Sequence, residues 1–248
     1  MGAKQSAVET LPSLESIHED WPWIWGIREA KFLDWKQGLS DDEIQAQALR
    51  QMEMPVRITD NIYLGNVSSV EAVTKLEALG ITAVLNMAGP VALKHKTVQA
   101  YERLGIRYKR ITADDEHDYP LLRNHWEEAH DYIKSSTKDG RDKCVIHCVA
   151  GINRSALIVA AYYMLTTQTP VLETVKHIRK QRGNVALSNE GFQQQLVALA
   201  RLNNLLGPMP GTEESIVKQL PPPPDVYSIF SSPKRERNPL DRLSFASK

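Results

Sequence analysis

A cysteine and an arginine stand six positions apart in the segment His147-Cys148-Val149-Ala150-Gly151-Ile152-Asn153-Arg154-Ser155. The apolar run before Cys148 predicts a strand, and the run after Arg154 predicts a helix. A loop of this length can turn successive backbone N–H groups inward, and the helix N-terminus adds about half a positive charge. Gly151 allows the backbone angles that such a turn needs. The spacing therefore predicts an anion site of phosphate size, lined by backbone groups of Val149, Ala150, Gly151, Ile152 and Asn153.

The same segment predicts nucleophilic chemistry. Cys148 would lie at the rim of the N–H groups, which together with Arg154 favour its anionic thiolate near neutral pH. The planar guanidinium of Arg154 can hold two oxygens of a bound phosphate at once. A phosphate held in this way presents its phosphorus to the sulfur. Cys148 is therefore the candidate nucleophile and Arg154 the candidate phosphate clamp.

A departing alkoxide or phenolate also needs a proton, and an acidic segment supplies candidates for its donor. The stretch "TADDEHDYP" at 112–120 contains Asp114, Asp115, Glu116 and Asp118. It follows a predicted strand and precedes a predicted helix, and an exposed loop is a suitable place for a general acid. Composition alone leaves open which of the four would act.

Short apolar runs alternate with amphipathic stretches around these residues, which is typical of an α/β domain. Strands are expected within 56–65, 81–88, 106–111 and 143–148. Helices are expected over 68–79, 90–104, 121–136, 156–165, 170–182 and 189–203. We expect these elements to form a central mixed, mostly parallel sheet of about five strands flanked by helices.

Composition divides the chain into three parts. Residues 1–55 are expected to form a helical N-terminal extension and 56–206 the main domain. Residues 207–248 carry a tetraproline at 221–224 and charged Ser-Pro segments, which predict a mostly disordered tail. The extension holds tryptophans at 21, 23, 25 and 35. So large an apolar load needs cover, which we expect the main domain to provide.

The charge balance is even, with 30 Lys and Arg against 30 Asp and Glu, so composition favours no nucleic-acid partner. The two cysteines, Cys144 and Cys148, would lie about 13 Å apart on one strand, beyond disulfide reach. Free thiols indicate a reducing compartment, and we expect a cytoplasmic protein, with the nucleus as an alternative. The histidines and cysteines show no metal-ligand spacing, so no metal site is expected.

The N-terminus adds a possible membrane contact to this picture. No apolar run reaches the roughly 20 residues that span a bilayer. The first six residues, Met-Gly-Ala-Lys-Gln-Ser, match the pattern for myristoylation of Gly2. No polybasic stretch follows to supply a second anchoring signal. Peripheral membrane association through Gly2 is therefore an alternative to a free N-terminus.

The loop "HCVAGINRS" resembles the H-C-x5-R-[ST] signature of the protein tyrosine phosphatase superfamily. Four further stretches resemble its dual-specificity branch: "IYLGN" at 62–66, "GITAVLNMA" at 80–88, "AYYM" at 161–164 and "NEGFQQQL" at 189–196. The resemblance spans about 56–203. It implies a protein tyrosine phosphatase-like fold and a phosphoric monoester hydrolase that uses a phosphocysteine intermediate and no metal or cofactor.

The resemblance also implies roles for individual residues. Ser155 would donate a hydrogen bond to the Cys148 sulfur, and His147 would brace the loop. Registration against the family pattern selects Asp115 as the general acid. The segment from Asp115 to Leu122 is one residue longer than usual, which leaves Asp114 and Glu116 open.

The loop residues narrow the substrate class. Val149, Ala150 and Ile152 are uncharged, which disfavours multiply phosphorylated inositol lipids. The chain lacks the K-N-R-Y stretch of tyrosine-only enzymes, which favours a shallow pocket for phosphoserine and phosphothreonine as well as phosphotyrosine. The expected partner is a phosphorylated protein, with a signalling kinase as one candidate. The pair Asn153 and Arg154 also resembles RNA 5′-triphosphatases, and a non-catalytic phosphoprotein-binding module is the third alternative.

Overall fold

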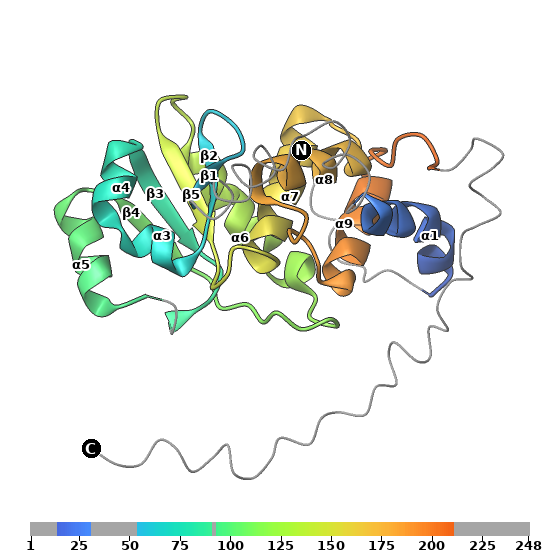
Figure 1. Ribbon diagram of the computed structural model, residues 1–248, viewed down its shortest axis with the longest axis horizontal. Coiled ribbons are helices and arrows are strands. Elements are labelled where there is room, and N and C mark those ends of the chain that lie inside the picture. The colour runs from blue at the N-terminus through green and yellow to red at the C-terminus, as the bar shows by residue number, and fades with distance from the viewer. Residues whose placement is uncertain (1–13, 31–53, 91–92, 211–248) are drawn as a thin grey trace, which may run out of the picture.

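The computed structural model describes residues 14–30, 54–90 and 93–210, with side chains from residue 19 onward. The described chain contains a five-stranded sheet in the order β1-β2-β5-β3-β4 (Figure 1). The strands are β1 (Val56–Arg57), β2 (Ile62–Gly65), β3 (Ile81–Asn86), β4 (Arg107–Arg110) and β5 (Lys143–His147). β1 pairs antiparallel with β2, and all other pairs are parallel. The expected mixed, mostly parallel sheet is confirmed.

The central strand β5 carries the chain toward the candidate nucleophile. Its last residue, His147, pairs with Gly65 at the end of β2 and with Asn86 at the end of β3. Three parallel strands therefore end together at one edge of the sheet, where Cys148 follows. In open α/β sheets this carboxyl edge is the usual place for ligand sites.

Helices cover both faces of the sheet (Figure 1). One face packs against α6 (Leu121–Ser136) and α7 (Arg154–Thr167), followed outward by α8 (Val171–Arg182) and α9 (Glu190–Leu202). The other face packs against α3 (Val67–Glu71), α4 (Val73–Ala78) and α5 (His95–Arg103). In β5 the side chains of Cys144 and Ile146 join the first core, and Val145 joins the second. This alternation follows from the two-residue period of a strand.

Two of the expected helices differ in the structure. The helix expected over 68–79 is divided at Ala72, whose ψ of 69° is not helical. Its start lies at Val67, because Asn66 and Ser69 form a reciprocal capping box with hydrogen bonds of 2.9 and 3.0 Å. The helix expected over 90–104 begins only at His95. The other helices match their expected ranges within about two residues.

The N-terminal helix α1 (Leu14–Glu29) packs against α8 and α9 at the far side of the helical layer (Figure 1). Trp21 and Trp23 are 5% and 8% exposed and belong to the main core, as expected for the tryptophans of this segment. Trp35, Gly2 and the segment 211–248 lie outside the described residues. None of the helices in the described ranges is long and apolar enough to cross a membrane.

Candidate active site

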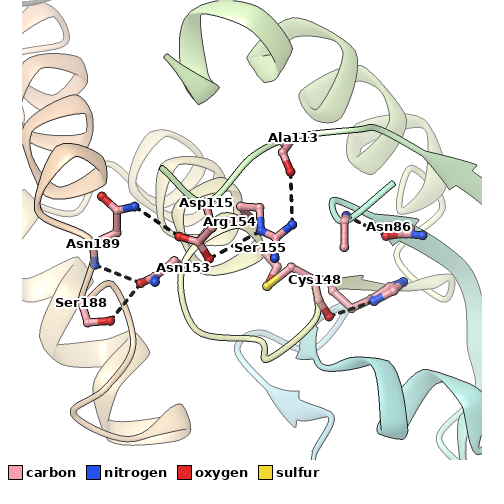
Figure 2. A network of polar contacts seen from close by, with 11 residues as sticks. Asn86, Ala113, Asp115, Cys148, Asn153, Arg154, Ser155, Ser188 and Asn189 are labelled. Carbon is pink, nitrogen blue, oxygen red and sulfur yellow. Dashed lines mark hydrogen bonds and ion pairs between the residues drawn. The ribbon is translucent and has the colours of Figure 1, made fainter. Parts of the chain in front are cut away.

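Cys148 lies directly after β5 and is 1% exposed. α7 begins six residues later at Arg154, so the loop between strand and helix contains residues 148–153. Ser155, in the first turn of α7, donates a hydrogen bond from its hydroxyl to the Cys148 sulfur at 3.2 Å (Figure 2). The strand and the helix thus place the sulfur and the hydroxyl in contact, which is the contact that the family resemblance implies.

The backbone of this loop is turned so that its carbonyl groups point outward. Four successive carbonyl oxygens accept hydrogen bonds of 2.9–3.1 Å from outside the loop: Val149 from the N–H of Val67, Ala150 and Gly151 from the guanidinium of Arg182, and Ile152 from the N–H of Leu187. In a trans peptide the N–H points opposite to the preceding C=O. Within the described chain, the N–H groups of 149–153 donate no hydrogen bond to protein. They are therefore available to a bound anion.

Gly151 is required by this arrangement for two reasons. Its φ is +64°, a left-handed conformation that favours glycine. A Cβ at this position would also lie 2.5 Å from the carbonyl oxygen of Gly65 and 2.6 Å from the Met54 side chain. The loop can approach the end of β2 this closely only because residue 151 has no side chain.

Arg154 reaches from α7 toward the acidic segment. Its Nη1 donates to the carbonyl oxygen of Ala113 at 3.1 Å, and its Nε lies 3.5 Å from a carboxylate oxygen of Asp115 (Figure 2). The other carboxylate oxygen of Asp115 accepts a hydrogen bond from Asn189 Nδ2 at 3.2 Å. Asp115 is thereby held beside the loop. Asp114 lies nearer to His125 of α6, whose pKa is lowered by burial against the opposing charges of Glu128 and Asp114.

His147 is fully buried beneath the loop. Its Nδ1 makes a hydrogen bond of 3.2 Å with the carbonyl oxygen of Cys148, which identifies Nδ1 as the protonated nitrogen. Burial lowers the pKa of His147 to about 4, so the ring is neutral at physiological pH. Its Nε2 has no hydrogen-bond partner within the described residues.

Residues 62–201 match the family model of the dual specificity phosphatase catalytic domain. The chain belongs to the dual specificity phosphatase family.

Its relatives cover the same region. Human dual specificity protein phosphatase 26 is 37% identical over 142 residues, which are 56% of this chain and 64% of the relative. Rat dual specificity protein phosphatase 5 is 35% identical over 143 residues, 58% of this chain and 35% of the relative. The crystal structure of DUSP15 superposes with a TM-score of 0.51 at 26% identity, covering 66% of this chain and 96% of that one. The chain thus spans less than two thirds of the length of these two curated relatives.

The sequence analysis missed the support that Ser188, Asn189 and Arg182 give to the site. Asn153 accepts hydrogen bonds from Ser188 Oγ at 3.1 Å and from the N–H of Asn189 at 3.0 Å (Figure 2). Arg182, which holds two loop carbonyls, stands at the end of α8 without any local signal of this role. The stretch "NEGFQQQL" marked the region of Asn189 as similar to the family but indicated no contact.

The acidic segment is also fixed from α9. Gln195 donates from Nε2 to the carbonyl oxygen of Tyr119 at 2.9 Å and accepts from the N–H of Leu122 at 3.1 Å. Gly191 lies so close to His117 that a Cβ would stand 1.7 Å from its carbonyl oxygen. The first turns of α9 therefore determine where the segment that carries Asp115 can lie.

The second cysteine has no part in the site. Cys144 is buried in β5, and burial raises the pKa of its thiol to about 12. It remains protonated at neutral pH and cannot act as a thiolate. Cys144 therefore offers a control for experiments on Cys148.

Proposed function

We propose that this chain is a protein phosphatase that hydrolyses phosphotyrosine and phosphoserine or phosphothreonine esters through a phosphocysteine intermediate. One observation carries this proposal: the Cys148 sulfur stands at the head of a loop whose N–H groups at 149–153 donate no hydrogen bond within the described chain and can bind a phosphate. Membership of the dual specificity phosphatase family supports the same reaction.

In the first step the Cys148 thiolate attacks phosphorus. The S–P bond forms while the bond from phosphorus to the ester oxygen breaks, and Asp115 gives its proton to that oxygen. The loop N–H groups and the guanidinium of Arg154 stabilise the charge on the phosphoryl oxygens. Asp115 stands beside the loop, with a carboxylate oxygen 3.5 Å from Arg154 Nε, which supports its assignment as the acid.

In the second step a water molecule replaces the sulfur. Asp115, now a carboxylate, takes a proton from the water as its oxygen attacks phosphorus. The S–P bond breaks, inorganic phosphate forms and the thiolate returns. Ser155 eases this departure, because its hydroxyl donates a hydrogen bond to the sulfur.

The two alternative functions find less support in the geometry. The RNA 5′-triphosphatase hypothesis depended on Asn153, whose side-chain oxygen is occupied by Ser188 and by the backbone of Asn189. This contact supports the loop and favours no RNA substrate. A non-catalytic binding module would not need a carboxylate beside Arg154, and Asp115 is held there.

The partner and location of the protein belong to the proposal as well. We expect a phosphorylated protein substrate, with a signalling kinase as a candidate, in the cytoplasm or nucleus. The Gly2 pattern supports peripheral membrane contact by myristoylation. Co-expression with an N-myristoyltransferase followed by mass spectrometry of the N-terminal peptide would test it, and an unmodified Gly2 would contradict it.

Hydrolysis of phosphotyrosine and phosphothreonine peptides in the presence of a metal chelator tests the central proposal. Wild type and Cys144→Ala should release phosphate, whereas Cys148→Ser should release none above background. Rapid acid quenching of wild type should trap a phosphoryl group on the peptide that contains Cys148. Equal rates for Cys148→Ser and wild type would overturn the cysteine mechanism, and release confined to 5′-triphosphorylated RNA would overturn the substrate class.

A further inference from the structure

A five-residue segment, 186–190, contacts both the loop after β5 and the candidate acid Asp115. We call it the support segment. The N–H of Leu187 binds the loop carbonyl of Ile152, and Ser188 and Asn189 bind the side chain of Asn153. Asn189 also binds Asp115. The position of both the phosphate loop and the candidate acid therefore depends on this segment.

The support segment does not adopt its conformation by local preference. Leu187 is buried and has a φ of +58°, a left-handed value that is unfavourable for a residue with a side chain. Such a conformation persists only where its surroundings impose it. The carbonyl oxygen of Leu187 accepts hydrogen bonds from Gln193 Nε2 at 2.7 Å and from Arg179 Nη2 at 3.5 Å.

Arg179 connects the support segment to the N-terminal helix α1. The side chain is 3% exposed, and its Nε donates to the carbonyl oxygen of Ala186 at 3.0 Å. Its Nη1 donates to the carbonyl oxygen of Ile27 in α1. Ile27 lies in the last turn of α1, where carbonyls lack partners within the helix and carry partial negative charge. The end of α1 is therefore a suitable acceptor for this buried cation.

α1 makes a second contact with the support segment, at the surface of the protein. Arg28, the next residue of α1, forms an ion pair with Glu190. Its guanidinium also lies over the rings of Trp21 and Trp25, at 5.3 and 6.0 Å from their centroids. Glu190 directly follows Asn189, whose side chain holds Asp115. Arg28 thus constrains the start of α9 beside the contact to the candidate acid.

We propose that α1 is a positioning element of the active site, which fixes the support segment through Arg179 and Glu190. α1 lies outside the residues 62–201 that match the family domain. Figure 1 shows α1 alongside α9, remote from the sheet. The inference rests on the proposed phosphatase function, because it concerns how that site is held.

The ion pair is tested in the full-length protein with Arg28→Ala, Glu190→Gln and the exchanged pair Arg28→Glu with Glu190→Arg. The matched control is Glu19→Gln. Glu19 also joins α1 to α9, because its carboxylate lies 3.3 Å from the guanidinium of Arg201, at the other end of α9. Each variant is assayed with a phosphoserine peptide and with 4-nitrophenyl phosphate. Only the peptide has a leaving group that depends strongly on Asp115.

Arg28→Ala and Glu190→Gln should each lower kcat for the phosphoserine peptide about fivefold, with 4-nitrophenyl phosphate changed less than twofold. The exchanged pair should restore the peptide rate, and Glu19→Gln should behave as wild type. Equal effects on both substrates, or losses no larger than that of the control, would overturn the role of the ion pair in positioning.

Arg179→Lys tests the buried contact, since lysine keeps the charge but cannot reach three carbonyl groups in the planar geometry of arginine. Inhibition by tungstate, an oxyanion that fills a phosphate site, should weaken about tenfold. Tungstate inhibition at the wild-type level in a folded protein would contradict the role of Arg179. If the variant does not fold, the Arg28 and Glu190 series decides the proposal.

The outcomes separate this inference from the proposed function. An inactive wild type would contradict the phosphatase, and tungstate binding measured by calorimetry on the same variants would then still report whether α1 affects the loop. An active wild type with unaffected variants would contradict only the role of α1.

Discussion

The Asp115 carboxylate is held from two sides, by the Arg154 guanidinium and by the Asn189 amide. We predict that Asp115→Asn lowers kcat for a phosphoserine peptide about 100-fold, because an amide cannot donate the required proton. The rate with an activated aryl phosphate should fall much less. Asp114→Asn and Glu116→Gln are matched controls from the same segment and should retain most activity. A larger loss in either control would move the acid to that residue.

The buried His147 predicts a dependence of stability on pH. Its pKa is about 4 in the folded state and about 6.5 when unfolded, so only the unfolded state takes up a proton between these values. The free energy of unfolding should therefore fall as the pH drops through this window, by about 2 kcal/mol between pH 7 and pH 5.

Urea unfolding of His147→Asn at both pH values measures this contribution. Asparagine keeps a donor near the Nδ1 position but does not titrate, so the difference between pH 7 and pH 5 should shrink by that amount. The exposed His95→Asn is the control and should leave the difference unchanged. A pH dependence that survives His147→Asn would assign it to other groups.

The loop after β5 can pack against the end of β2 because Gly151 has no side chain. Gly151→Ala should weaken tungstate inhibition and reduce activity at least tenfold, because its Cβ would clash with the backbone of Gly65. Gly105→Ala is a matched control, since Gly105 has a similar φ of +68° and nothing lies within 4 Å of its Cβ position. That control should lose about 1 kcal/mol of stability and keep its activity. Equal losses of activity in both variants would show that general destabilisation, and not a clash with Gly65, causes the loss.

Contacts of α1 with the helical layer also make it part of the folding unit. Its Ile24 and Ile27 are buried in the main core, and its buried Asp20 pairs with Arg201 of α9. We predict that Ile27→Ala lowers the free energy of unfolding by about 3 kcal/mol, through lost burial and a cavity. Leu202→Ala, at a side chain that is 50% exposed, should change it by less than about 1 kcal/mol.

Unfolding of the whole molecule should then be one cooperative transition. Tryptophan fluorescence, to which the three tryptophans of α1, Trp35 and Trp126 of α6 contribute, should change at the same urea concentration as helical circular dichroism. An earlier fluorescence change in the wild type would show that α1 unfolds separately and would weaken its proposed role in positioning.

The sequence by itself determined the elements and the local part of the site. Cys148, Gly151, Arg154 and Ser155 lie within eight consecutive positions, and their contacts follow from one strand, one turn and the start of one helix. The alternation of apolar residues in β5 and the 16-residue pattern of α6 have the same local origin. The division of a predicted helix at Ala72 had no such signal, because alanine is the strongest helix former and no Gly or Pro stands beside it.

The tertiary structure alone decided which distant residues support the loop. Asp115 and Asn189 are 74 positions apart, Gly151 and Arg182 are 31 apart, and Ile27 and Arg179 are 152 apart. Such contacts depend on how helices pack on the sheet, and no spacing along the chain records that. Registration against the family pattern selected Asp115 and left Asp114 and Glu116 open, and the fold places Asp115 beside Arg154. The fold also brings α1 to the support segment. This helix, which the sequence predicted only as part of an N-terminal extension, therefore contacts the residues that hold the site.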